Sequence, residues 1–234
     1  MSSEHIYKQF DADMEGVRAR VLEMGGLVEE QVGRAVEALI SGNVTLAEEV
    51  IVNDHKVNAM EVASDEACTH IIALRQPTAG DLRMILTIVK TITDLERIGD
   101  EAKKIARMAK LLSQKERLHL PRYNEIKRAS DIALDMLHKS LDAFARLDLA
   151  TAATVVRQDE LVDEEFRAVM RYLITFMMED PRTISTSLEI LFVAKAIERI
   201  GDHAKNMSEY VVYMVKGRDV RHVTVEEIER EVKQ

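Results

Sequence analysis

The sequence predicts an all-α fold of two similar three-helix bundles, in which six long antiparallel helices arise from an internal duplication. Composition is the first reason. Among 234 residues there are only three prolines, nine glycines and no tryptophan, which suits long packed helices. The second reason is that apolar residues recur every three or four positions, as on one face of a helix. The third is a repeat, because LERIGD at 95–100 returns as IERIGD at 197–202, 102 positions later.

The first unit should contain three helices, at about 7–40, 45–74 and 81–113. The first of these is predicted by apolar residues that alternate by four and three positions: Phe10, Met14, Val17, Val21, Met24, Val28 and Val32. Ser41-Gly42-Asn43 interrupts the pattern, and Gln76-Pro77 ends the second helix. Connections this short require neighbouring helices to run antiparallel.

The second unit follows a polar linker at 113–121 and repeats the plan with helices at about 122–147, 150–178 and 183–216. Gly217 suits the position just after a helix end, and Thr224 can cap one more short helix. The predicted organisation is therefore a first repeat over 1–115, a second repeat over 120–217 and a C-terminal tail over 218–234.

Charge and cysteine content narrow the class of protein. The net charge of −9 argues against a nucleic-acid partner, because neutralising phosphates requires a basic surface. Cys68 is the single cysteine and is interpreted as a buried apolar side chain, so no intrachain disulfide can form. The N-terminal residues lack the apolar segment of a signal peptide, and no apolar run is long enough to span a membrane. We therefore expect a cytoplasmic protein.

Each copy of the repeated motif carries an E-x-x-x-D pair, Glu96 with Asp100 and Glu198 with Asp202. Residues four apart lie on one helix face, so each pair presents two carboxylates to one region of space. A single pair of this kind usually belongs to a solvated helix face. Its recurrence at the same place in a repeat favours a cation site, and oxygen donors suit hard cations.

A second polar pair lies on the helix that precedes each motif. Asp54 with Asn58 in the first unit aligns with Asp159 with Asp163 in the second. The asparagine leaves the first predicted site one charge weaker than the second. Eight residues are therefore candidate metal ligands: Glu96, Asp100, Glu198, Asp202, Asp54, Asn58, Asp159 and Asp163.

The residues around the motif predict how it packs. Gly99 and Gly201 lie in a strip of small and apolar residues that lets another helix approach closely, with the carboxylates on its flank. Arg97 and Arg199 should point well away from the neighbouring glutamates. His203 is interpreted as a surface histidine or one that supports a ligand.

No motif for a catalytic nucleophile, a phosphate-binding loop or a zinc protease is present. We therefore expect a protein that is not an enzyme. Two alternatives stay open at this level. One is a metal-dependent enzyme in which clustered carboxylates activate water. The other is a metal-storage or purely structural helical protein.

Three longer segments are distinctive: RQPTAGDLRMI at 75–85, the first LERIGD with D-x-x-V-N upstream at 54–58, and IERIGDHAKNMSEY at 197–210. Together they resemble the PhoU family, accessory regulators of bacterial phosphate-specific transport. The resemblance extends over nearly the whole chain. It implies two three-helix bundles side by side, in agreement with the helix pattern.

The resemblance also implies a function. It points to a cytoplasmic protein, often a homodimer, that represses the phosphate-starvation (Pho) regulon and modulates phosphate uptake. Such a protein is an adaptor between the ATPase subunit of the Pst phosphate ABC transporter and a sensor histidine kinase, and it reaches the membrane only through these partners.

Some members of the family carry multinuclear metal clusters on their E(D)-x-x-x-D motifs. By position, the resemblance places Fe, Mn, Mg or Zn ions first at Glu96, Asp100, Glu198 and Asp202, and then at the four upstream residues.

Overall fold

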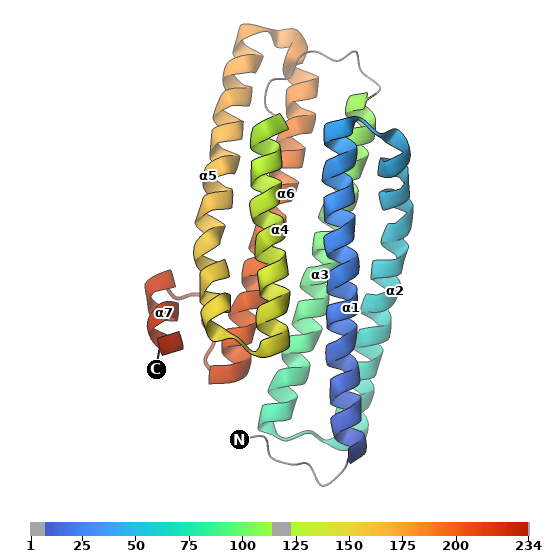
Figure 1. Ribbon diagram of the computed structural model, residues 1–234, viewed down its shortest axis with the longest axis vertical. Helices are drawn as coiled ribbons and strands as arrows, with labels where there is room; N and C mark the ends of the chain where they lie inside the picture. The colour runs from blue at the N-terminus through green and yellow to red at the C-terminus, as the bar shows by residue number, and fades with distance from the viewer. Residues whose placement is uncertain (1–7, 114–122, 234) are drawn as a thin grey trace.

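Figure 1 shows the computed structural model of the chain, in which residues 8–113 and 123–233 are described. Every element in these two ranges is helical. The first unit consists of α1 (Lys8–Ser41), α2 (Val44–Arg75) and α3 (Ala79–Ser113). The rest consists of α4 (Tyr123–Arg146), α5 (Leu149–Glu179), the short 3₁₀ helix η1 (Pro181–Thr183), α6 (Ile184–Lys216) and α7 (Val225–Lys233). The predicted all-α fold is confirmed, while the predicted linker lies almost entirely outside the described residues.

The short connections at the start of the two units use matching backbone conformations. Gly42 between α1 and α2 has a φ of 68°, and Leu147 between α4 and α5 has a φ of 56°. This left-handed region is open to glycine but strained for a residue with a Cβ. The next residue caps the following helix in both units, because the side chains of Asn43 and Asp148 accept hydrogen bonds from backbone N–H groups of α2 and α5.

The α2–α3 and α5–α6 turns lie at opposite ends of the molecule (Figure 1). Near the α2–α3 turn, Arg83 of α3 lies against Gly217, which ends α6 with a φ of 74°. A side chain at position 217 would overlap the guanidinium. Glycine therefore serves both the backbone conformation and this contact between the units.

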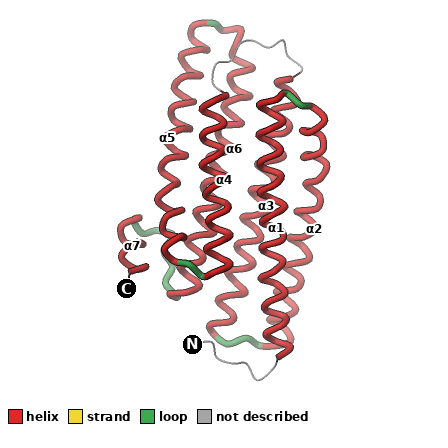
Figure 2. The backbone as a smooth tube through the Cα atoms, viewed as in Figure 1, coloured by secondary structure: helices red, strands yellow, loops and turns green. Residues whose placement is uncertain are grey.

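The middle of the molecule is formed by α1, α3, α4 and α6, with α2 and α5 at opposite edges (Figure 2). Within each unit the three helices pack on one another, and between the units α3 packs on α6 and α1 packs on α4. Gly25 of α1 permits the second of these contacts, because a Cβ there would overlap the side chain of Leu141 on α4. The two units share one continuous hydrophobic core.

The buried residues agree with the helix pattern. All seven apolar residues predicted for the first helix are buried. Cys68 is buried too, and burial raises the pKa of its thiol to about 11. In the described part of the chain, no helix combines the length and apolar character needed to cross a membrane.

Candidate metal-binding clusters

The first candidate site lies between α2 and α3. Asp54 is only 3% exposed, and its Oδ2 accepts a hydrogen bond from Lys103 Nζ at 2.5 Å. Its Oδ1 is buried and has no hydrogen-bond partner among the described residues. Asp100 is half exposed, and its Oδ1 lies 4.0 Å from the same ammonium group. Lys103 therefore lies between carboxylates of the two helices.

Glu96 and Glu61 complete this group. Burial raises the pKa of Glu96, and the charges of Asp100 and Glu61 add to the effect while Arg97 opposes it. Burial also raises the pKa of Glu61 on α2. We call Asp54, Glu61, Glu96 and Asp100 the first cluster. Asn58, the remaining residue predicted for this site, is exposed on α2.

The second candidate site lies between α5 and α6 and brings together four predicted residues: Asp159, Asp163, Glu198 and Asp202, here called the second cluster. Burial raises the pKa of Asp202 to about 6, and the other three carboxylates contribute to this rise. Lys205 Nζ donates a hydrogen bond to Asp159 Oδ2 at 2.7 Å. Each cluster thus contains a lysine that lies three positions after the motif aspartate.

The clusters differ in where their fourth carboxylate comes from. Asn58 of the first unit aligns with Asp163 of the second, whereas Glu61 aligns with Phe166. Lys195 Nζ lies 5.4 Å from the centroid of the Phe166 ring. Both clusters therefore have four carboxylates. Glu61 adds to the first cluster a carboxylate that Asn58 cannot provide, and the weaker charge expected for the first metal site stays a prediction.

Gly99 lets α3 lie close to α2 in the first unit, and Gly201 lets α6 lie close to α5 in the second. A Cβ at Gly99 would lie 3.3 Å from Val57 Cγ1, and one at Gly201 would lie 3.5 Å from Val162 Cγ1. Val57 and Val162 each lie three positions after the first aspartate of their cluster, Asp54 or Asp159. The predicted close approach is confirmed, and it sets the carboxylates of the motif beside those of the neighbouring helix.

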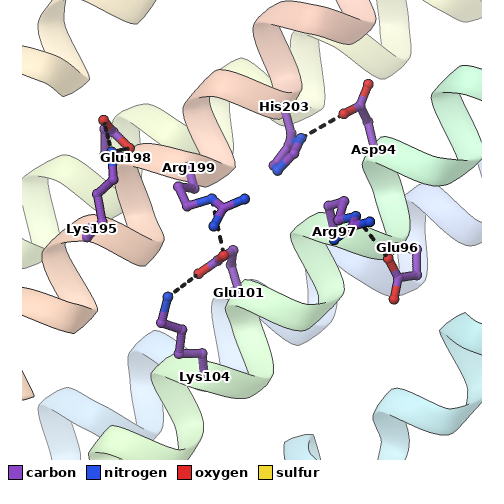
Figure 3. A network of polar contacts seen from close by, with 9 residues as sticks. All are labelled: Asp94, Glu96, Arg97, Glu101, Lys104, Lys195, Glu198, Arg199 and His203. Carbon is purple, nitrogen blue, oxygen red and sulfur yellow. Dashed lines mark hydrogen bonds and ion pairs between the residues drawn. The ribbon is translucent and has the colours of Figure 1, made fainter.

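Charged residues also connect the two units where α3 packs on α6 (Figure 3). Glu101 of α3 is buried, and its carboxylate lies 3.3 Å from Arg199 Nε of α6 and 3.1 Å from Lys104 Nζ. Nearby, His203 Nδ1 of α6 lies 2.7 Å from Asp94 Oδ1 of α3. A network of charges therefore crosses the junction of the units.

These contacts correct the expectations for two side chains. Arg97 was predicted to point away from its glutamate, but its Nε lies 3.7 Å from Glu96 Oε2 (Figure 3). The long side chain bends back, although the Cβ atoms of successive residues diverge on a helix. His203 is not at the surface, since most of its side chain is buried against the other unit.

A cavity of about 460 Å³ adjoins the second cluster. It opens between α6 and the segment that follows it, and its charged lining includes Asp202, Lys205, Glu209, Arg199 and Arg221. Glu209 is only 5% exposed, and burial raises the pKa of its carboxyl to about 7.

The comparisons with known proteins agree on one family. The PhoU domain matches residues 21–109 and 126–211. The chain belongs to the PhoU family. It is 47% identical over 228 residues to the phosphate-specific transport system accessory protein PhoU of Escherichia coli (strain K12), across 97% of this chain and 94% of that protein.

Two crystal structures share the PhoU fold. PhoU from Pseudomonas aeruginosa is 47% identical with a TM-score of 0.86, and the match covers 89% of this chain and 100% of that one. The phosphate transport system regulatory protein PhoU from Streptococcus pneumoniae is 29% identical with a TM-score of 0.83, and the match covers 90% and 99%. PhoU proteins are accessory regulators and not enzymes, so the alternative of a metal-dependent enzyme is set aside.

The chemistry of the two PhoU clusters suits a hard cation. Their donors are carboxylate oxygens, and the unpartnered Oδ1 of Asp54 is free to bind one. The side chains are not gathered around one point, however: within 8–113 and 123–233, no three Asp, Glu, His or Cys residues are placed to hold an ion. Lys103 and Lys205 instead provide positive charge. Metal binding at the eight predicted residues stays a prediction.

Sequence reasoning missed Glu61 and the two lysines, although signals for them exist. Glu61 lies seven positions after Asp54, which is about two helical turns on the same face. Lys103 and Lys205 recur at the spacing of the motif. A search for metal ligands overlooks them because a protonated amine has no lone pair to donate.

Proposed function

We propose that this PhoU protein is a negative regulator of the phosphate-starvation regulon and a modulator of phosphate uptake. The similarity along almost the entire chain to proteins of phosphate-specific transport carries the proposal. In this role the protein is a cytoplasmic adaptor. It contacts the ATPase subunit of the Pst transporter and the sensor histidine kinase, and it reaches the membrane only through them.

Exposed apolar side chains near the α5–α6 turn support the adaptor role. Five large ones from the two helices are exposed there: Ile174, Met178, Ile184, Leu188 and Phe192. Apolar residues gathered on a surface mark protein contact sites, whereas single ones are ordinary. We therefore propose that a partner binds at this end of the second unit.

Deletion of the gene in its source bacterium tests the regulatory role. With ample phosphate, loss of the protein should raise expression from a Pho-regulon reporter, and the wild-type chain supplied in trans should restore repression. A reporter that stays repressed after deletion would count against the proposal.

Phe192→Asp tests the proposed contact without disturbing the core. The variant should lose capture of the purified kinase or transporter ATPase while its helical circular dichroism stays the same. Val52→Asp is the matched control, because Val52 is an exposed apolar residue on α2 of the other unit. Equal capture by both variants and the wild type would exclude the α5–α6 end as the contact.

We also propose that the two clusters bind Fe, Mn, Mg or Zn ions that serve structure or docking. The ligands would be the eight predicted residues together with Glu61. Burial and mutual repulsion disfavour the charged form of these carboxylates, and a bound cation would supply the opposite charge. Elemental analysis after metal loading and dialysis should find metal in the wild type and less in Asp202→Asn. A metal-free wild type would contradict this.

The protein is further proposed to be a homodimer. Light scattering coupled to size-exclusion chromatography should give about twice the chain mass of 26.5 kDa. A mass near that of one chain at micromolar concentration would argue for a monomer.

A further inference from the structure

The cavity beside α6 has the size of a small-molecule site. Its volume is about 460 Å³, within the range of roughly 300–1,000 Å³ that ligand pockets occupy. Asp202 and Glu209 both line it, seven positions apart on α6. Seven residues are about two helical turns and rise roughly 10.5 Å, so the two carboxylates project to the same side at separate points along the cavity.

Both carboxylates lack a partner among the described residues. Glu209 is only 5% exposed, and neither it nor Asp202 makes a hydrogen bond or an ion pair within the described part of the chain. Burial raises the pKa of both carboxyl groups, as expected for acids without an adjacent positive charge. A buried carboxylate that opens on a cavity and has no partner points to a ligand that supplies one.

The arginine and lysine side chains that line the cavity are already paired with other carboxylates. The pairs are Arg199 with Glu101, Lys205 with Asp159, and Arg221 with Asp219. The charge that remains without a partner in the cavity is therefore negative. This favours a positively charged ligand and disfavours an anion.

The first unit carries cations of its own at the equivalent positions. Asn206 and Glu209 of α6 correspond to Lys104 and Arg107 of α3. Lys104 Nζ lies 3.1 Å from a carboxylate oxygen of Glu101. The second unit has a neutral amide where the first has this ammonium group, so the equivalent positive charge is missing from the cavity.

We propose that the cavity binds a linear polyamine, whose protonated amino groups lie against Asp202 and Glu209 and whose alkyl chain passes Asn206. Ammonium groups carry only hydrogen-bond donors, which match carboxylate oxygens and the amide oxygen of Asn206. Two such groups on a flexible chain can reach carboxylates two helical turns apart, whereas a monoamine can meet only one of them. The inference goes beyond the proposed regulatory role and does not depend on metal binding.

Isothermal titration calorimetry of the full chain with spermidine, at physiological salt and in the presence of EDTA, tests the proposal. The wild type should bind one spermidine per chain, and butylamine, which has a single amino group, should bind at least about tenfold more weakly. Glu209→Gln should weaken spermidine binding at least about tenfold, because the buried counter-charge is lost. Glu226→Gln is the control, since it removes the same charge from the exposed surface of α7 and should leave the affinity unchanged.

Asn206→Lys tests the comparison of the two units. It supplies the ammonium group that the first unit has at this position, and this internal cation should weaken spermidine binding at least about tenfold. Asn206→Gln keeps the amide and should change the affinity by less than about threefold. Helical circular dichroism verifies that each variant is folded.

Two results would overturn the proposal. One is a wild type that binds no spermidine at millimolar concentration. The other is an equal loss in Glu209→Gln and Glu226→Gln, which would show only diffuse attraction to the net charge of −9. Tighter binding of trilysine than of spermidine would also reject a free polyamine and assign the cavity to a basic segment of a partner protein. Because EDTA removes metal ions, these results stand apart from any metal binding by the two clusters.

Discussion

Arg97 and Arg199 occupy the same position in the two copies of the repeated motif, but they contact different parts of the molecule. Arg97 is mostly exposed and reaches back to Glu96 of its own helix, whereas Arg199 crosses to the buried Glu101 of the other unit. The difference arises because the counterpart of Glu101 in the second copy is His203, so the symmetric ion pair cannot form. The duplication has kept the helix packing, while the charges at the junction of the units have diverged.

A similar divergence distinguishes the surroundings of the two clusters. The buried Glu209 beside the second cluster corresponds to the exposed Arg107 beside the first. Equivalent backbones therefore carry a buried acid in one unit and an exposed base in the other.

The largest effect is expected where the two units meet. Gly25→Ala would push a methyl group into Leu141, and overpacking of this kind costs up to about 3 kcal/mol, which is offset by the roughly 0.5–1 kcal/mol by which alanine favours a helix over glycine. Because the core is shared, urea unfolding should remain a single transition at lower midpoint. Gly26→Ala is the control, since its Cβ would meet open space. It should raise the free energy of unfolding by about 0.5–1 kcal/mol. A partly folded intermediate in Gly25→Ala would show that the units fold separately.

Glu209→Gln should affect stability in a pH-dependent way that has no counterpart at Arg107. Burial raises the pKa of Glu209 from 4.5 to about 7, so the folded state retains a proton that the unfolded chain loses. The free energy of unfolding of the wild type should therefore fall as the pH rises through this window. Near pH 8.5 the variant should be more stable than the wild type by about 2 kcal/mol, and near pH 4 the two should be equal.

Urea unfolding across this pH range measures the effect. Glu226→Gln is a suitable control, because Glu226 is exposed on α7 and its substitution should leave the pH profile unchanged. A constant difference between Glu209→Gln and the wild type at all pH values would contradict the assignment of the titration to Glu209.

Alanine at the two motif arginines tests the asymmetry of the junction directly. Arg199→Ala leaves the buried Glu101 with Lys104 alone and should cost about 1.5 kcal/mol, which allows for the partial exposure of the arginine. Arg97→Ala removes an exposed contact and should cost less than about 0.5 kcal/mol. Equal losses of stability in thermal unfolding would mean that the ion pair between Arg199 and Glu101 stabilises the protein no more than the exposed contact between Arg97 and Glu96.

The smallest effect concerns the matching connections. Leu147→Gly should raise the free energy of unfolding by about 0.5 kcal/mol, because glycine relieves the left-handed conformation. Gly42→Ala should lower it by about 1 kcal/mol for the same reason. If Leu147→Gly proves destabilising, the contacts of the leucine side chain outweigh its backbone strain.

Local sequence determined the helices of this protein and many of the positions at which they begin and end. The four-and-three spacing from Phe10 to Val32 predicts a buried face, and Gly217 predicts the end of α6, because helix periodicity and capping depend on residues a few positions apart. The repeated motif also indicated that Asp159, Asp163, Glu198 and Asp202 would lie together. Spacing on two neighbouring helices was enough for that inference.

Only the tertiary structure decided which charges meet. Lys103 lies 49 positions after Asp54, and Arg199 lies 98 positions after Glu101, so no local pattern connects the members of either pair. Their contacts depend on which residues of two packed helices lie opposite each other, and for Lys103 and Asp54 the close approach of α3 to α2 at Gly99 sets that alignment. Long side chains then bend toward whichever opposite charge is within reach, as Arg97 and Arg199 do in different directions.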